Sequence, residues 1–327
     1  MKIGFTYDLK DDYIKIGFSK EDAAEFDSII TIEAIEEVLT EAGHNVVRIG
    51  NIINLVNLLA KGERWDIVFN IAEGVRGVGR ESQVPALLEA YGIPYTYSDS
   101  STLTVALHKG LTKQIVKEYC IPTAEFKTIK IGESIGHINI PYPLFVKPAA
   151  EGTGKGINSK SLIYNFYELE NYVKEIHEKF KQDALVEKFL PGREFTVGIS
   201  GTGDDAKSLG VLEIIFNENA KHKYYSYENK QNYHENVSYV MADKESSQKC
   251  NDVALAAWKS LGCLDGGRID LKMDAKGVPN FIEVNPLAGL NPVDSDLPII
   301  CQKVGIPYKQ LILDVINSAA KRYSLNA

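Results

Sequence analysis

The residues with the clearest chemical potential form two short polar groups toward the C-terminal end of the chain. Arg268 and Asp270 stand two residues apart, as do Glu283 and Asn285, and the turn sequence Asp-Ala-Lys-Gly at 274–277 separates the two pairs. Residues two apart on a strand share a face. A hairpin folded at this turn therefore places Asp270 near Glu283, and the other two side chains near each other. The carboxylates and the amide oxygen suit Mg²⁺, and the guanidinium suits a transferring phosphoryl group. A surface hairpin with a salt bridge is the alternative interpretation.

The composition is that of an ordinary soluble globular protein. The 327 residues are 44% apolar and 24% charged, and this length favours two or three domains. The net charge of −8 disfavours a nucleic-acid surface, and no stretch approaches the length of a membrane span. The first residues read as a strand and not as a signal peptide. The cysteines lack CxxC spacing, which favours thiols in a reducing compartment over a zinc site or disulfides, so we expect a cytoplasmic protein.

Short apolar runs alternate with helical patterns in residues 1–98, which predicts a parallel, Rossmann-like α/β sheet. The expected strands are 3–7, 46–49 and 66–69, and the expected helices are 31–41 and 84–91. Ligands of such sheets bind outside the carboxyl ends of the strands, where two long connections lie at 8–27 and 71–82. The second connection is rich in glycine and charge, and we interpret it as functional.

The rest of the chain alternates between strands and helices without an internal repeat. We expect strands at 126–129, 144–147, 184–189, 194–200 and 208–216, and helices at 102–119, 168–180, 252–261 and 308–322. Residues 221–236 are polar, rich in tyrosine and without periodicity. This segment fits a loop that closes over a bound substrate, and a solvent-exposed connection fits nearly as well.

A glycine-rich loop follows the expected strand that ends at Lys147. The loop reads Ala-Ala-Glu-Gly-Thr-Gly-Lys-Gly at 149–156, and the N–H groups of such loops can converge on phosphate oxygens. It is not a Walker A loop, because Ala149 stands in place of the first glycine and Gly156 in place of the hydroxyl residue. The dinucleotide pattern G-x-G-x-x-G is also missing. A flexible hairpin tip is the alternative.

A strand, a Pro-Gly break and a second strand follow at 185–197, with Glu187 and Glu194 on either side of the break. Such a break offers backbone groups to an adenine edge, while a carboxylate accepts from the adenine amine or from ribose hydroxyls. Taken alone, the segment also reads as a routine turn.

Taken in order, these pieces resemble the ATP-grasp superfamily, and most closely the D-alanine–D-alanine ligase family. The resemblance extends over nearly the whole chain and includes 92–96, the helix bearing Lys109 and Lys113, 187–197 and 257–263. It implies an α/β fold, α+β in the ATP-grasp part, with three domains. These would be an N-terminal Rossmann-like substrate domain (1–98), a central lid domain (99–188) and a C-terminal catalytic domain (189–327).

The resemblance also implies roles for the matching residues. The ATP-binding residues would be Lys109, Lys147, Gly152, Thr153, Gly154, Glu187, Lys188, Phe189, Leu190, Glu194 and Ile282. The metal ligands would be Asp270, Glu283 and Asn285, and the catalytic groups would be Arg268, Lys230 and the N–H of Gly289. The substrate-binding candidates are Glu25, Glu73, Arg76, Arg80 and Ser295.

The chemistry that the resemblance implies is ATP-dependent ligation of small amino acids by a homodimer, with no nucleic-acid or membrane partner. The γ-phosphoryl group of ATP would pass to a carboxylate, with two Mg²⁺ ions, or Mn²⁺ in their place, neutralising charge. An amine would then attack the acyl phosphate and release phosphate. A lid would keep water from that intermediate. No serine or cysteine nucleophile is required.

The sequence departs from the family pattern around the substrate. Glu73 stands where members usually carry histidine, Thr153 replaces a serine and Gln231 replaces a tyrosine. With the added cations Arg76 and Arg80, these changes predict a different amino acid or a dipeptide, possessing an acidic group that pairs with one arginine. Neutral drift in an enzyme that joins D-alanine is the alternative. Three further functions compete with this one: an ester-forming ligase with a hydroxy-acid substrate, an ATP-binding regulator without catalysis, and carboxylation of a biotin-type acceptor.

Overall fold

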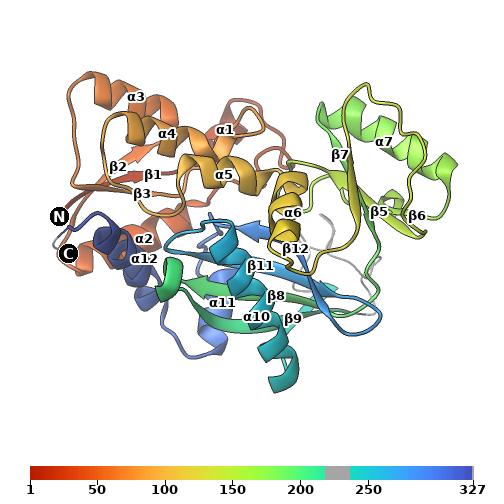
Figure 1. The fold of residues 1–327 in the computed structure, drawn as a ribbon. Helices are drawn as coiled ribbons and strands as arrows, with labels where there is room; N and C mark the ends of the chain where they lie inside the picture. The colour runs from red at the N-terminus through yellow and green to blue at the C-terminus, as the bar shows by residue number, and fades with distance from the viewer. Residues whose placement is uncertain (218–235, 326–327) are drawn as a thin grey trace.

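The N-terminal sheet is parallel, with strand order β2-β1-β3 (Figure 1). The computed structural model describes residues 1–217 and 236–325. The strands are β1 (Lys2–Thr6), β2 (Asn45–Gly50) and β3 (Ile67–Asn70), with helices α1 (Lys10–Lys15), α2 (Ile29–Glu41), α3 (Ile52–Ala60), η1 (Arg80–Ser82) and α4 (Gln83–Ala90). Strands β1 and β3 are buried on both faces, so helices must cover both faces of the sheet there. Apolar side chains of α2 pack on one face and those of α3 and α4 on the other, which confirms the predicted parallel α/β unit.

The central sheet is antiparallel, with order β4-β7-β5-β6. Its elements are β4 (Phe126–Ile129), β5 (Leu144–Pro148), η2 (Ser159–Ser161), β6 (Leu162–Ile163), α7 (Phe166–Phe180) and β7 (Ala184–Lys188). Helix α7 is capped by Asn165, whose side chain accepts from the backbone N–H of Glu168. The helix buries a stripe of apolar side chains made of Leu169, Val173 and Ile176. This stripe packs against the sheet and leaves the opposite face of β5 and β7 for polar contacts.

The third sheet has five antiparallel strands in the order β10-β9-β8-β11-β12. Its elements are β8 (Glu194–Ser200), η3 (Gly203–Asp205), β9 (Lys207–Phe216), β10 (Val237–Met241), α10 (Lys244–Ser260), β11 (Gly266–Met273), β12 (Pro279–Asn285) and α11 (Asp296–Lys303). Ile269 and Leu271 share a core with α10, whereas Gly198 packs against Leu297 and Ile300 of α11. Strand alternation therefore places Arg268, directly opposite Gly198, on the α11 side of the sheet.

The prediction of one helix over 102–119 is wrong. The chain forms α5 (Ser100–Leu107) and α6 (Lys109–Glu118), separated by His108 in an extended conformation at φ −91° and ψ 92°. No glycine or proline stands at His108 itself, although Gly110 follows two residues later. The backbone N–H of Lys109 donates to the carbonyl of Ala149 at 2.9 Å, so a contact with a distant loop ends one helix and starts the next. The break places Lys109 at the beginning of α6, facing the glycine-rich loop.

Several further elements are not predicted by the sequence patterns, namely α1, α3, β6, β10 and α11. Helix α10 also begins at Lys244 and not at 252. Its cap is Asp243, whose Oδ1 accepts from the backbone N–H of Ser246 at 2.9 Å. Helix α3 begins in the same way at Asn51, whose side chain accepts from two backbone N–H groups. Both α10 and α3 thus start at a side-chain cap.

The C-terminal helix α12 (Tyr308–Arg322) packs into the same hydrophobic cluster as β1, β3 and α2. At this joint, the buried carboxylate of Asp265 accepts from Arg322 at 2.7 Å and from the backbone N–H of Tyr97 at 2.8 Å. Each sheet lies within one of the three expected domains, and the domain limits themselves remain predictions.

We predict that Asp265→Asn lowers the free energy of unfolding by about 3 kcal/mol, because it leaves the Arg322 guanidinium without its buried counter-charge. Denaturant unfolding measures the change. The matched control is Asp204→Asn, because Asp204 pairs with Lys259 at the exposed surface and such pairs contribute little to stability. Equal effects in the two variants would show that the Asp265–Arg322 pair contributes no more to stability than a surface pair.

Candidate active site

The hairpin of β11 and β12 brings together the two polar groups singled out in the sequence. Arg268 pairs with Asn285 and Asp270 pairs with Glu283, as predicted, with a register shift immediately after Asp270. The turn forms because Asp274 accepts from the N–H groups of two later turn residues through its side chain. Arg268 and Asp270 are only 6% and 8% exposed, so a solvent-exposed surface hairpin is excluded.

Carboxylates and cations alternate along this face of the sheet. The Arg268 guanidinium donates to both oxygens of Asp270 at 2.6 and 2.7 Å and lies 3.2 Å from Asp296. The Nζ of Lys109 lies 3.3 Å from Glu283. Burial, together with Glu283 nearby, raises the pKa of Asp270 to about 6 against the effect of Arg268. Burial also opposes ionisation of Glu283, but the surrounding cations, Lys109 first among them, bring its pKa to about 2.

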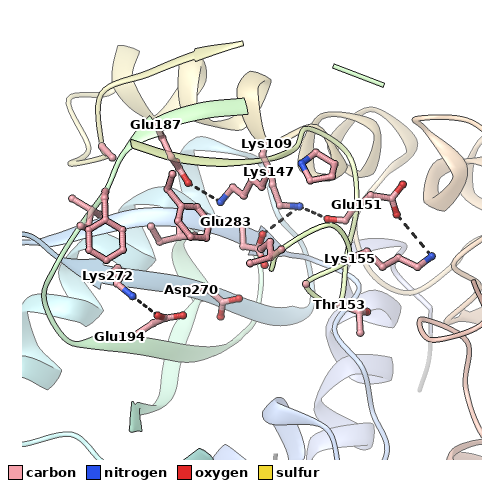
Figure 2. A pocket seen from close by; sticks show the side chains of 18 of the residues that line it. Lys109, Lys147, Glu151, Thr153, Lys155, Glu187, Glu194, Asp270, Lys272 and Glu283 are labelled. Atoms are coloured by element: carbon pink, nitrogen blue, oxygen red, sulfur yellow. Dashed lines mark hydrogen bonds and ion pairs between the residues drawn. The ribbon is translucent and has the colours of Figure 1, made fainter. Parts of the chain in front are cut away.

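Two buried lysines, Lys113 and Lys147, hold the carboxylate of Glu187 in the wall of the cleft. Figure 2 shows the contact with Lys147. The two oxygens of Glu187 lie 2.8 Å from the Nζ of Lys113 and 2.9 Å from the Nζ of Lys147. Burial lowers the pKa of Lys113, whereas Glu187 and Glu283 outweigh burial at Lys147 and raise its pKa. Burial would likewise raise the pKa of Glu187, but the two lysines bring it to about 2. Lys113 also donates to the carbonyl of Phe281 in β12, which ties the central sheet to the third sheet.

The cleft between these sheets has a volume of about 870 Å³ and a mixed apolar and polar wall. Besides the charged groups just described, its wall includes Phe145, Lys188, Phe189, Leu190, Glu194, Lys272 and Ile282. The backbone N–H groups of Lys188 and Phe189 donate within the chain, to the carbonyls of Glu125 and Pro143. Glu194 accepts from Lys272 at 2.6 Å.

The glycine-rich loop lies over one end of the cleft, where Thr153, Gly154 and Lys155 line it (Figure 2). The Nζ of Lys109 donates to the carbonyl of Glu151 and so anchors the loop from α6. Gly156 has φ +74°, and a Cβ there would lie 2.5 Å from the ring of Pro148. Only glycine permits this close return of the loop onto β5.

A second cavity of about 1590 Å³ adjoins the cleft, because Lys109, Thr153, Arg268 and Glu283 line both. Besides Arg268, the predicted substrate-binding and catalytic residues that line this cavity are Glu25, Glu73, Gly289 and Ser295. The predicted metal ligand Asn285 lines it as well. A Cβ at Gly289 would lie 2.7 Å from the Oγ of Ser295, so a side chain there would displace the Ser295 hydroxyl.

The two arginines expected to face a substrate do not line this cavity. Arg80 donates to both oxygens of Glu25 at 3.1 and 2.9 Å, and Arg76 is exposed. Asp27, Glu73 and Glu81 line the cavity, and burial raises the pKa of Asp27 and of Glu81 to about 7. The cavity is therefore lined by more carboxyl groups than the sequence suggested, and burial raises the pKa of Glu73 as well, so burial favours the protonated form of each.

Several residues of the site were missed by reasoning from sequence alone. Lys272 continues the two-residue spacing of Arg268 and Asp270, and this signal could have found it. Asp296 and Glu81 have no comparable signal, because their positions depend on distant contacts. Lys230 and Gln231 lie outside the described residues. Within residues 1–217 and 236–325, no helix is long and apolar enough to cross a membrane.

Two antiparallel sheets that enclose a cleft lined by lysines, a glycine loop and a carboxylate hairpin define the ATP-grasp class. A family model described as "D-ala D-ala ligase C-terminus" matches residues 115–317. The chain belongs to the D-alanine–D-alanine ligase family. The identity of the residues that match the family's site remains a prediction at each position.

Individual relatives agree with this assignment. The chain is 31% identical to a D-alanine–D-alanine ligase of Gluconobacter oxydans (strain 621H), over 90% of this chain and 95% of that protein. It is also 31% identical to the D-alanine–D-alanine ligase of Aquifex aeolicus (strain VF5), over 88% and 94%. The fold matches the Bacillus anthracis enzyme of that name complexed with ATP, with a TM-score of 0.75, 22% identity and 99% coverage of each chain. It also matches the VanG D-Ala:D-Ser ligase of Enterococcus faecalis, with a TM-score of 0.73, 19% identity and coverage of 97% and 99%.

We predict that Glu187→Gln lowers the free energy of unfolding by about 3 kcal/mol at pH 7, because the folded-state pKa lies near 2 instead of 4.5. A lowered carboxyl pKa stabilises the fold above pH 4.5, and this contribution is lost as the pH falls toward 2. Chemical unfolding at several pH values should therefore show the two proteins converging below pH 4.5. Glu175→Gln, at an exposed pair with Lys160, is the control and should change little. A difference that persists unchanged at pH 2 would refute the charge assignment.

Proposed function

We propose that this protein is an ATP-dependent ligase that joins two amino acids through an acyl phosphate, releasing ADP and phosphate. The observation that carries this proposal is the buried hairpin face of Arg268, Asp270, Glu283 and Asn285 beside Lys109, at the junction of two cavities. The relatives named as D-alanine–D-alanine ligases support the reaction type.

The cleft between the central and third sheets is the proposed nucleotide site. Phe145, Phe189 and Ile282 supply apolar walls for a purine, and Leu190 supplies a backbone donor at its edge. Lys188 would contribute its backbone carbonyl to the same edge. Glu187 would accept from the adenine amine and Glu194 from the ribose. Lys109 and Lys147 would bind phosphate oxygens, with Gly152, Thr153 and Gly154 covering the γ-phosphate.

The hairpin residues fit a divalent cation. Asp270 and Glu283 provide two carboxylates and Asn285 an amide oxygen, while nucleotide phosphates would complete the oxygen ligands that Mg²⁺ prefers. In the described residues no group of three or more His, Cys, Asp or Glu side chains forms a metal site, so the amide and the phosphates are needed. Bound Mg²⁺, or Mn²⁺ in its place, would neutralise phosphate charge and polarise the transferring group. We expect two ions.

The residues of the chain position and shield the reacting groups. Arg268 is held by Asp270 and Asp296, so its guanidinium is fixed at the shared wall of the two cavities. Together with the N–H of Gly289, Arg268 would stabilise the oxyanion that forms when the amine attacks the acyl carbonyl. The glycine-rich loop would exclude water from the acyl phosphate.

The second cavity is the proposed amino-acid site, with Glu25, Glu73 and Ser295 on its wall. Its acidic lining favours neutral or cationic amino acids over the acidic substrate that the sequence predicted. The regulator, ester-forming and biotin-type functions are not favoured by the family assignment. The homodimer and the cytoplasmic location stay predictions.

We predict that a panel of D- and L-amino acids, scored by phosphate release, stimulates ATP turnover with neutral or cationic D-amino acids. D-aspartate and D-glutamate should react at least about tenfold more slowly, because a further carboxylate would be buried among the acidic side chains of Glu73 and Glu81, where burial already disfavours the ionised form. Product masses distinguish an amide from an ester. Preference for an acidic amino acid would refute this interpretation of the cavity, and nucleotide binding without stimulated ADP formation would favour the regulator.

We predict that Asp270→Asn and Glu283→Gln each lower turnover by about 10³-fold or more, because they remove carboxylates that face the transferring phosphoryl group. Both replacements keep the size of the side chain, so circular dichroism should show the wild-type fold, although Glu283→Gln leaves Lys109 without its carboxylate partner and should lower the unfolding temperature. Glu245→Gln, at a surface pair with Lys249, is the matched control and should keep full activity. An active double variant would be incompatible with the proposed site.

A further inference from the structure

An ion pair between two segments of the N-terminal unit reaches the glycine-rich loop of the central unit. Arg80 in η1 and Glu25 in the connection after α1 make a two-pronged contact at 3.1 and 2.9 Å. Their side chains are only 9% and 8% exposed. A buried pair with two contacts has a fixed geometry, unlike a single contact at the surface.

The same two side chains also bind the backbone at the start of the loop. The Nη1 of Arg80 donates to the carbonyl of Ala150 at 3.1 Å. The backbone N–H of Gly152 donates to Oε1 of Glu25 at 2.9 Å. The carbonyl of Ala150 and the backbone N–H of Gly152 are thereby both hydrogen-bonded to side chains of the N-terminal unit.

Two glycines make this close approach possible. A Cβ at Gly152 would lie 2.5 Å from Oε1 of Glu25, so any side chain there would push the carboxylate away. A Cβ at Gly74 would lie 2.4 Å from the carbonyl oxygen of Arg80, and Gly74 has φ +73°. The backbone on each side of the ion pair is therefore shaped to fit it.

The charges of the surroundings favour the ionised pair. Burial alone would raise the pKa of Glu25, but Arg80 and then Lys155 outweigh it and lower the pKa. Burial alone would lower the pKa of the Arg80 guanidinium, but the carboxylates that face it, with Glu25 the strongest, raise it. Lysine could not replace this arginine, because one ammonium cannot reproduce the planar fork that contacts a carboxylate and a carbonyl together.

We propose that Arg80 is a positioning residue that, through Glu25 and the carbonyl of Ala150, fixes the glycine-rich loop over the nucleotide cleft. Thr153 and Gly154, which follow directly, line that cleft, so the position of the loop start determines how the cleft is closed. The role of Arg80 in catalysis rests on the proposed function. Its role in holding the loop does not.

Hydrogen exchange of the unliganded protein tests the loop contact directly. In Arg80→Lys, backbone amides of residues 149–156 should exchange about tenfold faster, because hydrogen bonds to charged groups are lost and the loop opens locally. Arg48→Lys is the matched control, since Arg48 makes an arginine–glutamate pair with Glu36 in the same unit, away from the loop. Unchanged exchange at 149–156, or faster exchange throughout the chain, would overturn the proposal. If Arg80→Lys does not fold, Glu25→Gln decides by the same criterion.

A second measurement separates positioning from a merely structural role. If the loop is misplaced, water attacks the acyl phosphate in place of the amine, returning the carboxylate and releasing phosphate. The ratio of ADP released to peptide bonds formed should then rise severalfold in Arg80→Lys and stay unchanged in Arg48→Lys. An equal loss of both products, with the ratio unchanged, would overturn the proposal. If the wild-type protein forms no peptide bond, the proposed function fails, and the exchange measurement still decides the role of Arg80.

Discussion

Compensation of buried charge is the constraint on which the active-site structure depends. Glu187, Asp270 and Glu283 are each placed against a cation, and an uncompensated buried charge would cost about 3–5 kcal/mol. The pairs connect different elements, because Lys113 of α6 contacts both Glu187 of β7 and the backbone of β12. The ion pairs thereby position the two sheets relative to each other. Nucleotide binding then requires only that phosphates and cations replace existing partners.

The hairpin could be predicted because its turn and the spacing of its side chains are local. The two-residue period indicates which side chains share a face, and the Asp-x-x-Gly turn starts the pairing of β11 with β12. The register next to the turn would place Asp270 opposite Ile282, and the shift after Asp270, which the sequence does not indicate, places it opposite Glu283. Lys147 could be placed for a similar reason, since an apolar strand ends on it. Lys113 lies four residues after Lys109 on one helix, so its side chain follows the same face toward the cleft.

The features that could not be predicted depend on contacts between distant parts of the chain. The break at His108 has no glycine or proline and exists because Lys109 bonds to Ala149. Arg80 reads in the sequence as a cation available to a substrate, yet its partner Glu25 lies 55 residues away. Whether a charged side chain is available to a ligand depends on the residues that pair with it. A pair between residues this far apart in the sequence leaves no periodic pattern that would indicate it. This is why the nucleotide side was easier to anticipate than the amino-acid side.

The Arg80–Glu25 pair also limits which carboxylates of the proposed amino-acid cavity can bind a substrate. Glu25 lines the cavity, but the adjacent guanidinium cancels most of its charge, and its Oε1 already accepts from Gly152. Among the described residues, Glu73 and Glu81 line the same wall without an ion pair, and burial raises the pKa of both. On the proposed function, a substrate ammonium bound there would favour their ionised forms. Glu25 thus connects the proposed amino-acid cavity to the glycine-rich loop. Its neighbours Glu73 and Glu81 then influence the charge of the ligand that the cavity accepts. On the proposed function, recognition of the amine and closure over ATP would be carried by different residues of the same wall.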